Sequence, residues 1–339
     1  MKILHLLTTN QFSGAENVCL SIMNILKNEH DVYYASVDGP IRNTVENMGH
    51  TFVPMNSFSI GNVKNVIHQI QPDVIHAHDI RASVYSAFVY RGKIISQIHG
   101  KFPEMGHISL KSVLYRLACN KINKIIYVSQ SIYDDFLFKK QLDKKGFLLH
   151  NCVDYSSIQN RLRNISDAPS FDFTFIGRLE PVKNPLRFIH IIEKLSRLYK
   201  KEVSACIVGD GSLYSECESL IHSSNVNIKL VGFQKEPLRY LIHSKALIIT
   251  SVTEGIPMVA LEAFASEKPV ISTPTDGLLE IIHEGHNGFI CETDDDFVYH
   301  MMDLLSNDER YAEIVQNLKQ GKDDYTSYCE SIRNIYLNM

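Results

Sequence analysis

Short runs of β-branched and aliphatic residues alternate with amphipathic stretches along nearly the whole chain. In the first half these runs are mostly apolar on both faces, as in a parallel sheet that is covered by helices on both sides. The strands that we expect there are residues 3–7, 32–36, 74–77, 94–98 and 124–128. The helices expected between them are residues 15–26, 41–48, 63–70, 82–90 and 110–118. The alternation predicts a doubly wound α/β domain.

The second half repeats the alternation after residues 151–171, which gather Ser, Asn, Asp and Pro and are predicted to form a linker. The strands expected there are residues 173–176, 204–208, 228–231, 246–250 and 270–272, and the helices are residues 185–198, 213–221, 237–242 and 258–265. A last helix, residues 325–337, lies outside this pattern. We therefore predict two domains, 1–160 and 170–322, with the segment at about 325–339 packing back on the first.

Composition places the chain among globular enzymes. Hydrophobic residues make up 45% and charged residues 21%, which is ordinary for a soluble domain. The seven cysteines are odd in number and show no C-x-x-C spacing, which argues against a disulfide framework or a zinc ribbon and favours a reducing cytoplasm. The opening apolar run is too short for a signal peptide, and no run approaches the roughly 18 apolar residues of a membrane helix. We expect neither a membrane span nor a nucleic-acid partner.

One segment, residues 250–270, combines a strand end, two carboxylates and a helix start. Pro257 suits the first helical position, so the helix is predicted to begin at about Ile256. The free N–H groups of such a helix would face an anion beyond the carboxyl end of the strand. Glu254 and Glu262 would repel the anion itself, so we expect them to accept hydrogen bonds from attached hydroxyl groups. A sugar and a ribose on either side of a diphosphate meet this requirement, whereas chance placement of two glutamates is the alternative.

Two cations follow the strand at residues 173–176. Arg178 and Lys183 could neutralise a diphosphate, and the planar guanidinium of arginine suits phosphate oxygens. Solvated surface cations are the alternative. The segments IVGDGSL and LVGF end two further strands in glycine, where a ligand could approach. IVGDGSL lacks the third glycine of a dinucleotide fingerprint, so it does not predict a nicotinamide site.

The first half offers a glycine and several histidines at the ends of strands. Gly14 precedes a helix and would allow close approach of a ligand, although a plain helix cap explains it too. His76 and His78 point to one face by strand alternation, but no third metal ligand is placed with them in the sequence. His99 ends the next strand at the same edge of the sheet, and it is predicted either to contact a ligand or to pack.

Eight segments of the chain carry a family resemblance, and in chain order they are SGAE, DVIHAHD, the strand-end His-Gly, LLHNCVD, GRLEPVKN, VGDGSL, VGF and EGIPMVALEA. Together they resemble the retaining family 4 glycosyltransferases of the GT-B fold. The resemblance covers nearly the whole chain. It implies two Rossmann-like doubly wound domains that face each other across a cleft. The second domain would hold most of a nucleotide-sugar donor, and the first would hold the acceptor. Ser13 and His150 depart from residues that are common in the family.

The resemblance also implies roles for individual residues. Glu254 would contact the hydroxyls of the donor sugar and Glu262 the ribose, while Arg178 and Lys183 would bind the diphosphate. The remaining residues with implied roles are Met258 and Val259, whose N–H groups would complete the phosphate site; Gly255, in the same donor-binding segment; Gly232 and Phe233, near the base; His99, close to the transferred sugar; and Gly14, near the donor phosphate.

The implied reaction moves a hexosyl or N-acetylhexosaminyl unit from a nucleotide sugar, with UDP the expected carrier, to a growing bacterial-type glycan. Retention would follow if the departing phosphate oxygen took the proton of the acceptor hydroxyl on the same face, with no metal or cofactor. The D-x-D spelling at Asp294 to Asp296 is better explained as a helix start. The alternatives are a nucleotide-sugar epimerase, a sugar phosphorylase, and a non-catalytic partner that binds nucleotide sugars.

Charge is unevenly distributed. Residues 1–150 hold 16 Lys and Arg against 11 Asp and Glu, and residues 91–145 alone carry a net charge of +7 in a chain of −4. Within them an apolar stripe at helical spacing lies beside Lys111 and Arg116; its members are Leu110, Val113, Leu114 and Leu117. The simplest prediction is a stripe that faces the core below a solvated basic face. The alternative is peripheral binding to anionic lipid on the inner face of the membrane, where a polyprenyl-linked glycan would be the acceptor.

Overall fold

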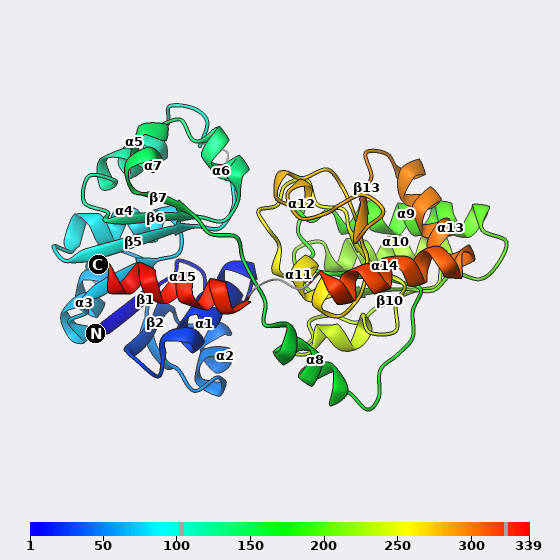
Figure 1. The fold of residues 1–339 in the computed structure, drawn as a ribbon, viewed down its shortest axis with the longest axis horizontal. Coiled ribbons are helices and arrows are strands. Elements are labelled where there is room, and N and C mark those ends of the chain that lie inside the picture. Colours follow the sequence, from blue (N-terminus) through cyan, green and yellow to red (C-terminus); the bar gives the residue numbers. More distant parts are fainter. Residues whose placement is uncertain (102–104, 322–324) are drawn as a thin grey trace. The chain divides into compact units, whose positions relative to one another are not determined.

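The computed structural model describes residues 1–101, 105–321 and 325–339. It divides into two compact units, of which unit 1 is Met1–Asn151 with Thr326–Met339 and unit 2 is Cys152–Tyr325 (Figure 1). Each unit is built on one parallel β-sheet. Among the described residues no helix is long and apolar enough to cross a membrane.

Unit 1 contains a seven-stranded sheet in the order β3-β2-β1-β4-β5-β6-β7. Its strands are β1 (Lys2–Leu6), β2 (Asp31–Val37), β3 (Thr51–Met55), β4 (Val74–Ala77), β5 (Lys93–Ile98), β6 (Lys124–Tyr127) and β7 (Gly146–Leu148). Its helices are α1 (Gly14–Leu26), α2 (Ile41–Asn47), α3 (Ile60–Ile70), α4 (Ile80–Val89), α5 (Leu110–Ala118), α6 (Gln130–Asp135), α7 (Lys139–Lys145) and α15 (Tyr325–Leu337). The strand order reverses between β1 and β4, where α/β sheets commonly bind ligands beyond the carboxyl ends of their strands.

Unit 2 contains a six-stranded sheet in the order β10-β9-β8-β11-β12-β13. Its strands are β8 (Phe173–Ile176), β9 (Ala205–Val208), β10 (Ile228–Leu230), β11 (Ala246–Ile249), β12 (Val270–Ser272) and β13 (Gly288–Ile290). Its helices are α8 (Tyr155–Arg163), α9 (Pro185–Leu198), α10 (Tyr214–Ser224), the 3-10 turn η1 (Pro237–Tyr240), α11 (Met258–Ala265), α12 (Asp276–Leu279), α13 (Asp294–Ser306) and α14 (Asp308–Gln320). Strands β9 and β11 are buried along their whole length, as the apolar runs predict.

All ten predicted strands and the predicted helices form, most of them within one or two residues of the expected ends. The prediction misses helices α6, α7, α12 and α14 and three strands at sheet edges, which are β3, β7 and β13. Of these strands, β3 contains Pro54. Proline is tolerated there because an edge strand has one row of N–H groups without partners. The predicted linker is wrong in part, because α8 forms within it. Asp154 caps α8 by accepting a hydrogen bond from the N–H of Ser157 at 3.0 Å.

Helix α15 packs against unit 1. Its residues Tyr328, Ile332, Ile335 and Tyr336 are buried. The ammonium of Lys124 donates to the carbonyl of Ile335 at 3.1 Å, and the guanidinium of Arg333 forms an ion pair of 2.8 Å with Glu29.

The D-x-D segment starts α13, as predicted. Thr293 accepts a hydrogen bond from the N–H of Asp296, and the carboxylate of Asp296 accepts one from the N–H of Thr293 at 2.8 Å. This reciprocal pair is a capping box. Asp294 forms an ion pair of 2.7 Å with Arg187, so these carboxylates are used within the fold.

The prediction that the apolar stripe of α5 faces the core is wrong. Leu110 is 76% exposed and Leu117 52% exposed, while Ser112, Tyr115 and Ala118 make up the buried face. The hydroxyl of Tyr115 shares a hydrogen bond of 2.8 Å with the Ser96 hydroxyl in β5. Tyr115 thereby fills the space over the sheet. Leu110, Val113 and Leu117 are left at the surface, and only Leu114 of the stripe packs partly buried against the core.

Candidate functional site

In unit 2 the loops that follow β8 and β11 are fastened to each other. Lys183 forms an ion pair with Glu254. The hydroxyl of Thr250 donates to the carbonyl of Asn184 at 2.8 Å, and the N–H of Val252 donates to the carbonyl of Val182 at 2.8 Å. The two segments GRLEPVKN and EGIPMVALEA, which are distant in sequence, therefore form one structure at the carboxyl edge of the sheet.

The ion pair is shielded but open to solvent on one side. The Lys183 side chain is 21% exposed and that of Glu254 is 10% exposed. Glu254 also accepts a hydrogen bond from the hydroxyl of Ser251 at 2.7 Å, which fixes its carboxylate. A ligand that enters here meets a positioned carboxylate, which accepts hydrogen bonds, and a cation, which binds phosphate oxygens.

Helix α11 spans Met258–Ala265, which is the range predicted from the apolar pattern, whereas the start at about Ile256 inferred from Pro257 is wrong. Pro257 precedes the helix in an extended conformation, with ψ 129°. Ile256 is excluded from the helix because a residue before proline disfavours helical angles. The N–H of Ala260 reaches back to the carbonyl of Pro257 at 3.0 Å. The N–H groups of Met258 and Val259 have no backbone acceptor among the described residues, so two donors are free at a positive helix end.

The other predicted donor-site residues lie on loops of the same unit or on α11. Arg178 is exposed, and its side chain has no hydrogen bond or ion pair within the described part of the chain. Phe233, after β10, is 60% exposed, and Gly232 beside it has φ +70°. Glu262 lies on α11 and is partly buried. The structure thus presents a free guanidinium and a free aromatic ring from loops at the carboxyl ends of the strands.

The glycines of IVGDGSL serve packing, which corrects the prediction that they leave room for a ligand. A Cβ atom on Gly209, at φ +149°, would lie 1.8 Å from the carbonyl oxygen of Gly177. A Cβ atom on Gly211 would lie 2.5 Å from the carbonyl oxygen of Leu179. The N–H of Leu179 donates to the carbonyl of Asp210 at 2.9 Å. The glycines allow the loop that carries Arg178 to lie directly against the loop after β9.

Unit 1 gathers four histidines where β1, β4 and β5 lie side by side. His5 and His76 are register partners on β1 and β4. The His5 Nδ1 and His78 Nε2 atoms are hydrogen-bonded at 2.9 Å, and the His78 Nδ1 and His99 Nε2 atoms at 3.0 Å. The ring of His76 stacks on that of His78 with centroids 4.1 Å apart, and its Nδ1 is hydrogen-bonded to the Tyr336 hydroxyl at 2.5 Å. We name these four residues the histidine cluster.

Burial keeps the histidine cluster uncharged. Desolvation lowers the pKa of His5 to about 3, with a further contribution from His50, and desolvation alone lowers the pKa of His99 to about 3. Desolvation, followed by the neighbouring rings, holds the pKa values of His76 and His78 well below 6.5. Each ring is therefore neutral near pH 7 and carries one N–H.

Two further potential metal ligands lie beside His78, which the sequence did not indicate, but His76 is not part of this group. His5 and Cys19 lie beside His78, and one potential ligand atom from each lies within 4.8 Å of the other two. All three side chains are buried. Burial raises the pKa of the Cys19 thiol well above its usual value, and the charge of Glu16 adds to the effect. Two histidine nitrogens and one thiol suit zinc, although the two nitrogens that face each other already share a hydrogen bond.

Gly14 is the first residue of α1, and a Cβ atom added to it would meet nothing within 4 Å. The preceding Ser13 makes no side-chain cap to the helix backbone. Its hydroxyl and that of Thr9 instead bind the buried carboxylate of Glu16. The plain-cap alternative is therefore not supported, and the space beside Gly14 is open.

Sequence reasoning missed two groups of residues at these sites. Ser251 and Thr250 orient the Glu254 loop, but their hydroxyl groups carry no distinctive pattern. His5 could have been found, because a histidine at the centre of an apolar strand lies beside its register partner in a neighbouring strand once the sheet order is known. The approach of Cys19 from α1 depends on helix packing, which the sequence does not specify.

Two family models match the chain. The model described as "Glycosyl transferases group 1" matches residues 158–321, and "Glycosyltransferase Family 4" matches residues 12–157. An Escherichia coli protein, "UDP-Gal:alpha-D-GlcNAc-diphosphoundecaprenol alpha-1,3-galactosyltransferase", is 24% identical over 87% of this chain and 85% of its own. A Campylobacter jejuni alpha-1,4-N-acetyl-D-galactosaminyltransferase, whose name includes a PP-undecaprenol glycan, is 30% identical over 48% of each chain. The crystal structure of Anabaena HepE in complex with UDP and glucose has a TM-score of 0.84 at 20% identity and covers 100% of both chains.

Together the two models cover residues 12–321, and the chain belongs to the family 4 glycosyltransferases of the GT-B fold. Its two parallel-sheet, Rossmann-like units are the architecture that the sequence motifs predict. The enzyme is a glycosyltransferase.

Proposed function

We propose that the enzyme is a retaining, metal-independent glycosyltransferase that moves a hexosyl or N-acetylhexosaminyl unit from a UDP-sugar to a glycan acceptor linked to a polyprenyl diphosphate. The observation that carries this proposal is the joint placement of Lys183 and Glu254 with the free N–H groups of Met258 and Val259. Cations and helix N–H groups stabilise a leaving diphosphate, and a fixed carboxylate orients sugar hydroxyls. The UDP and acceptor assignments are supported by the names of the relatives.

Retention follows from the chemistry proposed for this site. No carboxylate other than Glu254 is proposed at the donor sugar, and Glu254 binds its hydroxyls. The acceptor oxygen forms its bond to the anomeric carbon on the face from which the diphosphate leaves. The departing phosphate oxygen takes the acceptor proton, and Arg178, Lys183 and the start of α11 stabilise the negative charge that develops on the diphosphate.

The test is a transfer assay with UDP-, GDP- and ADP-sugars and a synthetic polyprenyl-diphosphate-linked acceptor. NMR of the product gives the anomeric configuration, and EDTA with metal analysis of the protein gives the metal requirement. We expect transfer from a UDP-sugar with retention in the presence of EDTA. An inverted product, or activity that EDTA removes and Mg²⁺ restores, would contradict the proposal.

The same assay without acceptor separates the alternatives. An epimerase would convert the donor to its epimer, which NMR detects. A sugar phosphorylase would consume a glycan and inorganic phosphate and release a sugar phosphate. A non-catalytic partner would bind the donor tightly and transfer nothing to any acceptor.

The acceptor side of the proposal places the enzyme on anionic lipid through an amphipathic surface of unit 1. The exposed apolar residues of this surface, which we name the α5 surface, are Ile108, Leu110, Val113 and Leu117. Arg116, Lys121, Lys139 and Lys140 are exposed in the same stretch of chain. Apolar side chains beside cations are typical of helices that lie in a bilayer interface, and each cation near anionic lipid contributes about 1 kcal/mol.

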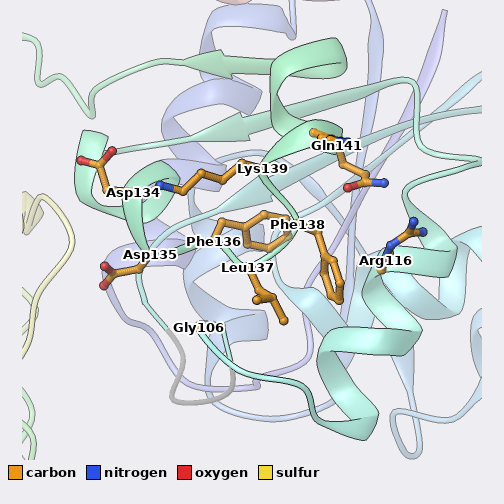
Figure 2. A pocket seen from close by; sticks show the side chains of 10 residues that line it. Gly106, Arg116, Asp134, Asp135, Phe136, Leu137, Phe138, Lys139 and Gln141 are labelled. Atoms are coloured by element: carbon orange, nitrogen blue, oxygen red, sulfur yellow. The ribbon is translucent and has the colours of Figure 1, made fainter.

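Next to α5 the surface is hollowed. The hollow encloses about 510 Å³ and is lined by Gly106, Arg116 and residues 134–141. Figure 2 shows Arg116 and Lys139 on opposite sides of the apolar side chains of Phe136, Leu137 and Phe138. The Arg116 guanidinium lies 5.4 Å from the centre of the Phe138 ring. Cations that border apolar side chains suit a phospholipid headgroup and the chain below it.

Not all cations of this stretch are available to lipid. The Lys145 ammonium donates to the carbonyl of Cys119 at 2.8 Å, and Lys101 forms an ion pair with Asp135. Lys124 is bound to α15. The net charge of the stretch therefore overstates its attraction to lipid, and the α5 surface with its exposed cations carries the interaction.

Co-sedimentation with liposomes tests the membrane proposal. We expect binding to vesicles with anionic lipid at low salt and release at high salt, because charges are screened within about 8 Å at physiological ionic strength. The double variant Leu110→Ser/Leu117→Ser should lose most of the binding. The matched control is Leu198→Ser/Leu279→Ser, which changes two leucines of unit 2 that are 54% and 52% exposed. Equal recovery of wild type in the supernatant with and without anionic lipid at low salt would contradict membrane binding and indicate a soluble acceptor.

A further inference from the structure

Three residues of the histidine cluster form a continuous hydrogen-bonded chain. It runs from His5 through His78 to His99, with one N···N contact of 2.9 Å and one of 3.0 Å. Its two ends, His5 Nε2 and His99 Nδ1, are buried atoms without a hydrogen-bond partner among residues 1–101, 105–321 and 325–339. The rings of His78 and His99 are nearly parallel, with an angle of 15° between their planes.

A chain of neutral imidazoles has only two arrangements of its protons. Each neutral ring has one N–H and one acceptor nitrogen, and each N···N contact needs one of each. Either all three rings carry the proton on Nδ1, or all three carry it on Nε2. The nitrogen that His99 leaves free, Nδ1, is a donor in the first arrangement and an acceptor in the second.

The burial of the two ends favours the first arrangement. With the protons on Nδ1, the unpartnered donor is at His99, which is only partly buried, and His5 leaves an unpartnered acceptor. With the protons on Nε2, the unpartnered donor would be at His5, which is 0% exposed. Orphaned buried N–H groups are rarer in proteins than under-satisfied acceptors, so the donor belongs at the less deeply buried end of the chain, which is His99.

We propose that His5 and His78 are positioning residues that hold His99 in the Nδ1–H tautomer, so that His99 presents an N–H donor to an oxygen of the donor substrate. The proposal rests on the proposed function for the role of His99 but not for the tautomers themselves. His76 restricts the orientation of the His78 ring, because the ring of His76 stacks on it and is hydrogen-bonded to Tyr336 of α15.

Two variants at position 78 separate the two hydrogen bonds of His78. An asparagine amide nitrogen occupies the place of Nδ1, so His78→Asn keeps a donor toward His99. A glutamine amide nitrogen occupies the place of Nε2, so His78→Gln keeps a polar group toward His5 and loses the bond to His99. The pair is matched in charge and polarity and differs in the bond that the proposal requires.

The first measurement is long-range ¹⁵N–¹H NMR of histidine-labelled full-length protein at pH 7.5, which reads the tautomer of each ring directly. We expect His5, His78 and His99 of the wild type all to be Nδ1–H, and His99 to keep this form in His78→Asn and lose it in His78→Gln. An Nε2–H form at any of the three residues in the wild type overturns the proposal, and this result needs no variant to fold. A stoichiometric metal in purified protein that His5→Asn and Cys19→Ser each remove also overturns it.

The second measurement is the transfer rate. We expect kcat of His78→Gln to fall by about tenfold or more, as with other wrong-tautomer substitutions, and His78→Asn to stay within about threefold of wild type. Equal rates for the two variants would overturn the positioning role even if the tautomers are as stated. Absence of transfer by the wild type would count against the proposed function and leave the NMR test of the tautomers intact.

Discussion

The ammonium group of Lys183 forms an ion pair with the carboxylate of Glu254, although 71 positions separate the two residues in the chain. The pair joins the loop after β8 to the loop after β11. We propose that a diphosphate competes for Lys183 while sugar hydroxyls bind Glu254. Donor binding would then exchange one set of charged contacts for another rather than create a site from disordered loops.

Alanine substitutions of Arg178 and Lys183 are predicted to have different effects on the free energy of unfolding and the same effect on UDP binding. Arg178→Ala should leave the free energy of unfolding unchanged, because the guanidinium has no partner in the described fold. Lys183→Ala should cost roughly 1 kcal/mol, since it removes the counter-ion of a partly shielded carboxylate. Both should weaken UDP binding by about tenfold or more, the cost of losing a charged hydrogen bond.

Isothermal titration with UDP and urea unfolding measure the two effects of each variant. Lys194→Ala is the matched control, because Lys194 pairs with the exposed Asp295 on α13 of the same unit. UDP affinity of Arg178→Ala and Lys183→Ala equal to that of the control would show that these cations do not bind the diphosphate.

Two glycines are predicted to respond in opposite ways to alanine. Gly209→Ala should destabilise the protein by roughly 2 kcal/mol or more, because the new Cβ would meet the carbonyl oxygen of Gly177 at a positive φ. Gly14→Ala should leave the melting temperature unchanged or higher, since the space is open and alanine favours helix. If that space receives a donor phosphate, Gly14→Ala should raise the KM for the UDP-sugar. An unchanged KM for Gly14→Ala would exclude the donor from this space.

Acid should destabilise unit 1 more than unit 2. Burial lowers the pKa of all four residues of the histidine cluster below their value of 6.5 in an unfolded chain, to about 3 for His5 and His99. Below pH 6.5 the unfolded state therefore binds more protons than the folded state. Stability is complete above about pH 6.5 and is lost as the pH falls toward 3. In that window each such histidine lowers the free energy of unfolding by about 1.4 kcal/mol for each pH unit.

Urea unfolding at pH 7.5 and pH 5.5, followed by hydrogen exchange of peptides from each unit, measures this difference in the full-length protein. In unit 2 burial lowers the pKa of His300, which is one residue against the four of the histidine cluster. Between pH 7.5 and pH 5.5 the urea concentration at which unit 1 unfolds is therefore expected to fall clearly more than that of unit 2. An equal shift in the two units would show that the histidine cluster is not kept neutral by the fold.

Phe233 is predicted to contribute to binding of the donor and not to the stability of the fold. Its ring is 60% exposed, so Phe233→Ala should leave stability within about 0.5 kcal/mol of wild type. Loss of a stacking platform for a base costs about 1 to 3 kcal/mol, so the KM for the UDP-sugar should rise at least about fivefold. Steady-state kinetics with a saturating acceptor measures this, and Tyr299→Ala, at a ring 69% exposed on α13, is the control. An unchanged KM would place the base elsewhere.

Local patterns were sufficient to predict most of the fold. Apolar runs of period 2 and 3.6 located β8, β12, α5, α9 and α11, because the residues at these elements satisfy burial and helix geometry together. The pattern failed where another interaction decided the outcome. On α5 the leucines have the helical spacing of a core stripe, but Tyr115 and its hydrogen bond to Ser96 turn a different face to the sheet.

The candidate site was predicted as a set of residues but not as a geometry. The segments around Lys183 and Glu254 can be recognised in the sequence by their cations, their carboxylates and a proline before a helix. The ion pair between the two residues depends on how the loops after β8 and β11 fold together. The histidine cluster could not be predicted in full, because His5 and His78 meet only through the order of strands in the sheet. The role of the glycines after β9 was misread, since close approach of a second loop and close approach of a ligand leave the same pattern in the sequence.

The most direct test of the account is the rate of glycosyl transfer by Glu254→Gln with the UDP-sugar and acceptor identified for the wild type. This variant keeps the size of the side chain and removes the charge, and Glu236→Gln, which breaks an ion pair with Arg161 elsewhere in unit 2, is the control. We predict that Glu254→Gln folds like the wild type and loses about a hundredfold in kcat, or roughly 2.7 kcal/mol of transition-state stabilisation, while the control keeps its rate. A Glu254→Gln rate equal to that of the wild type would contradict the assignment of this site as the one that binds the transferred sugar.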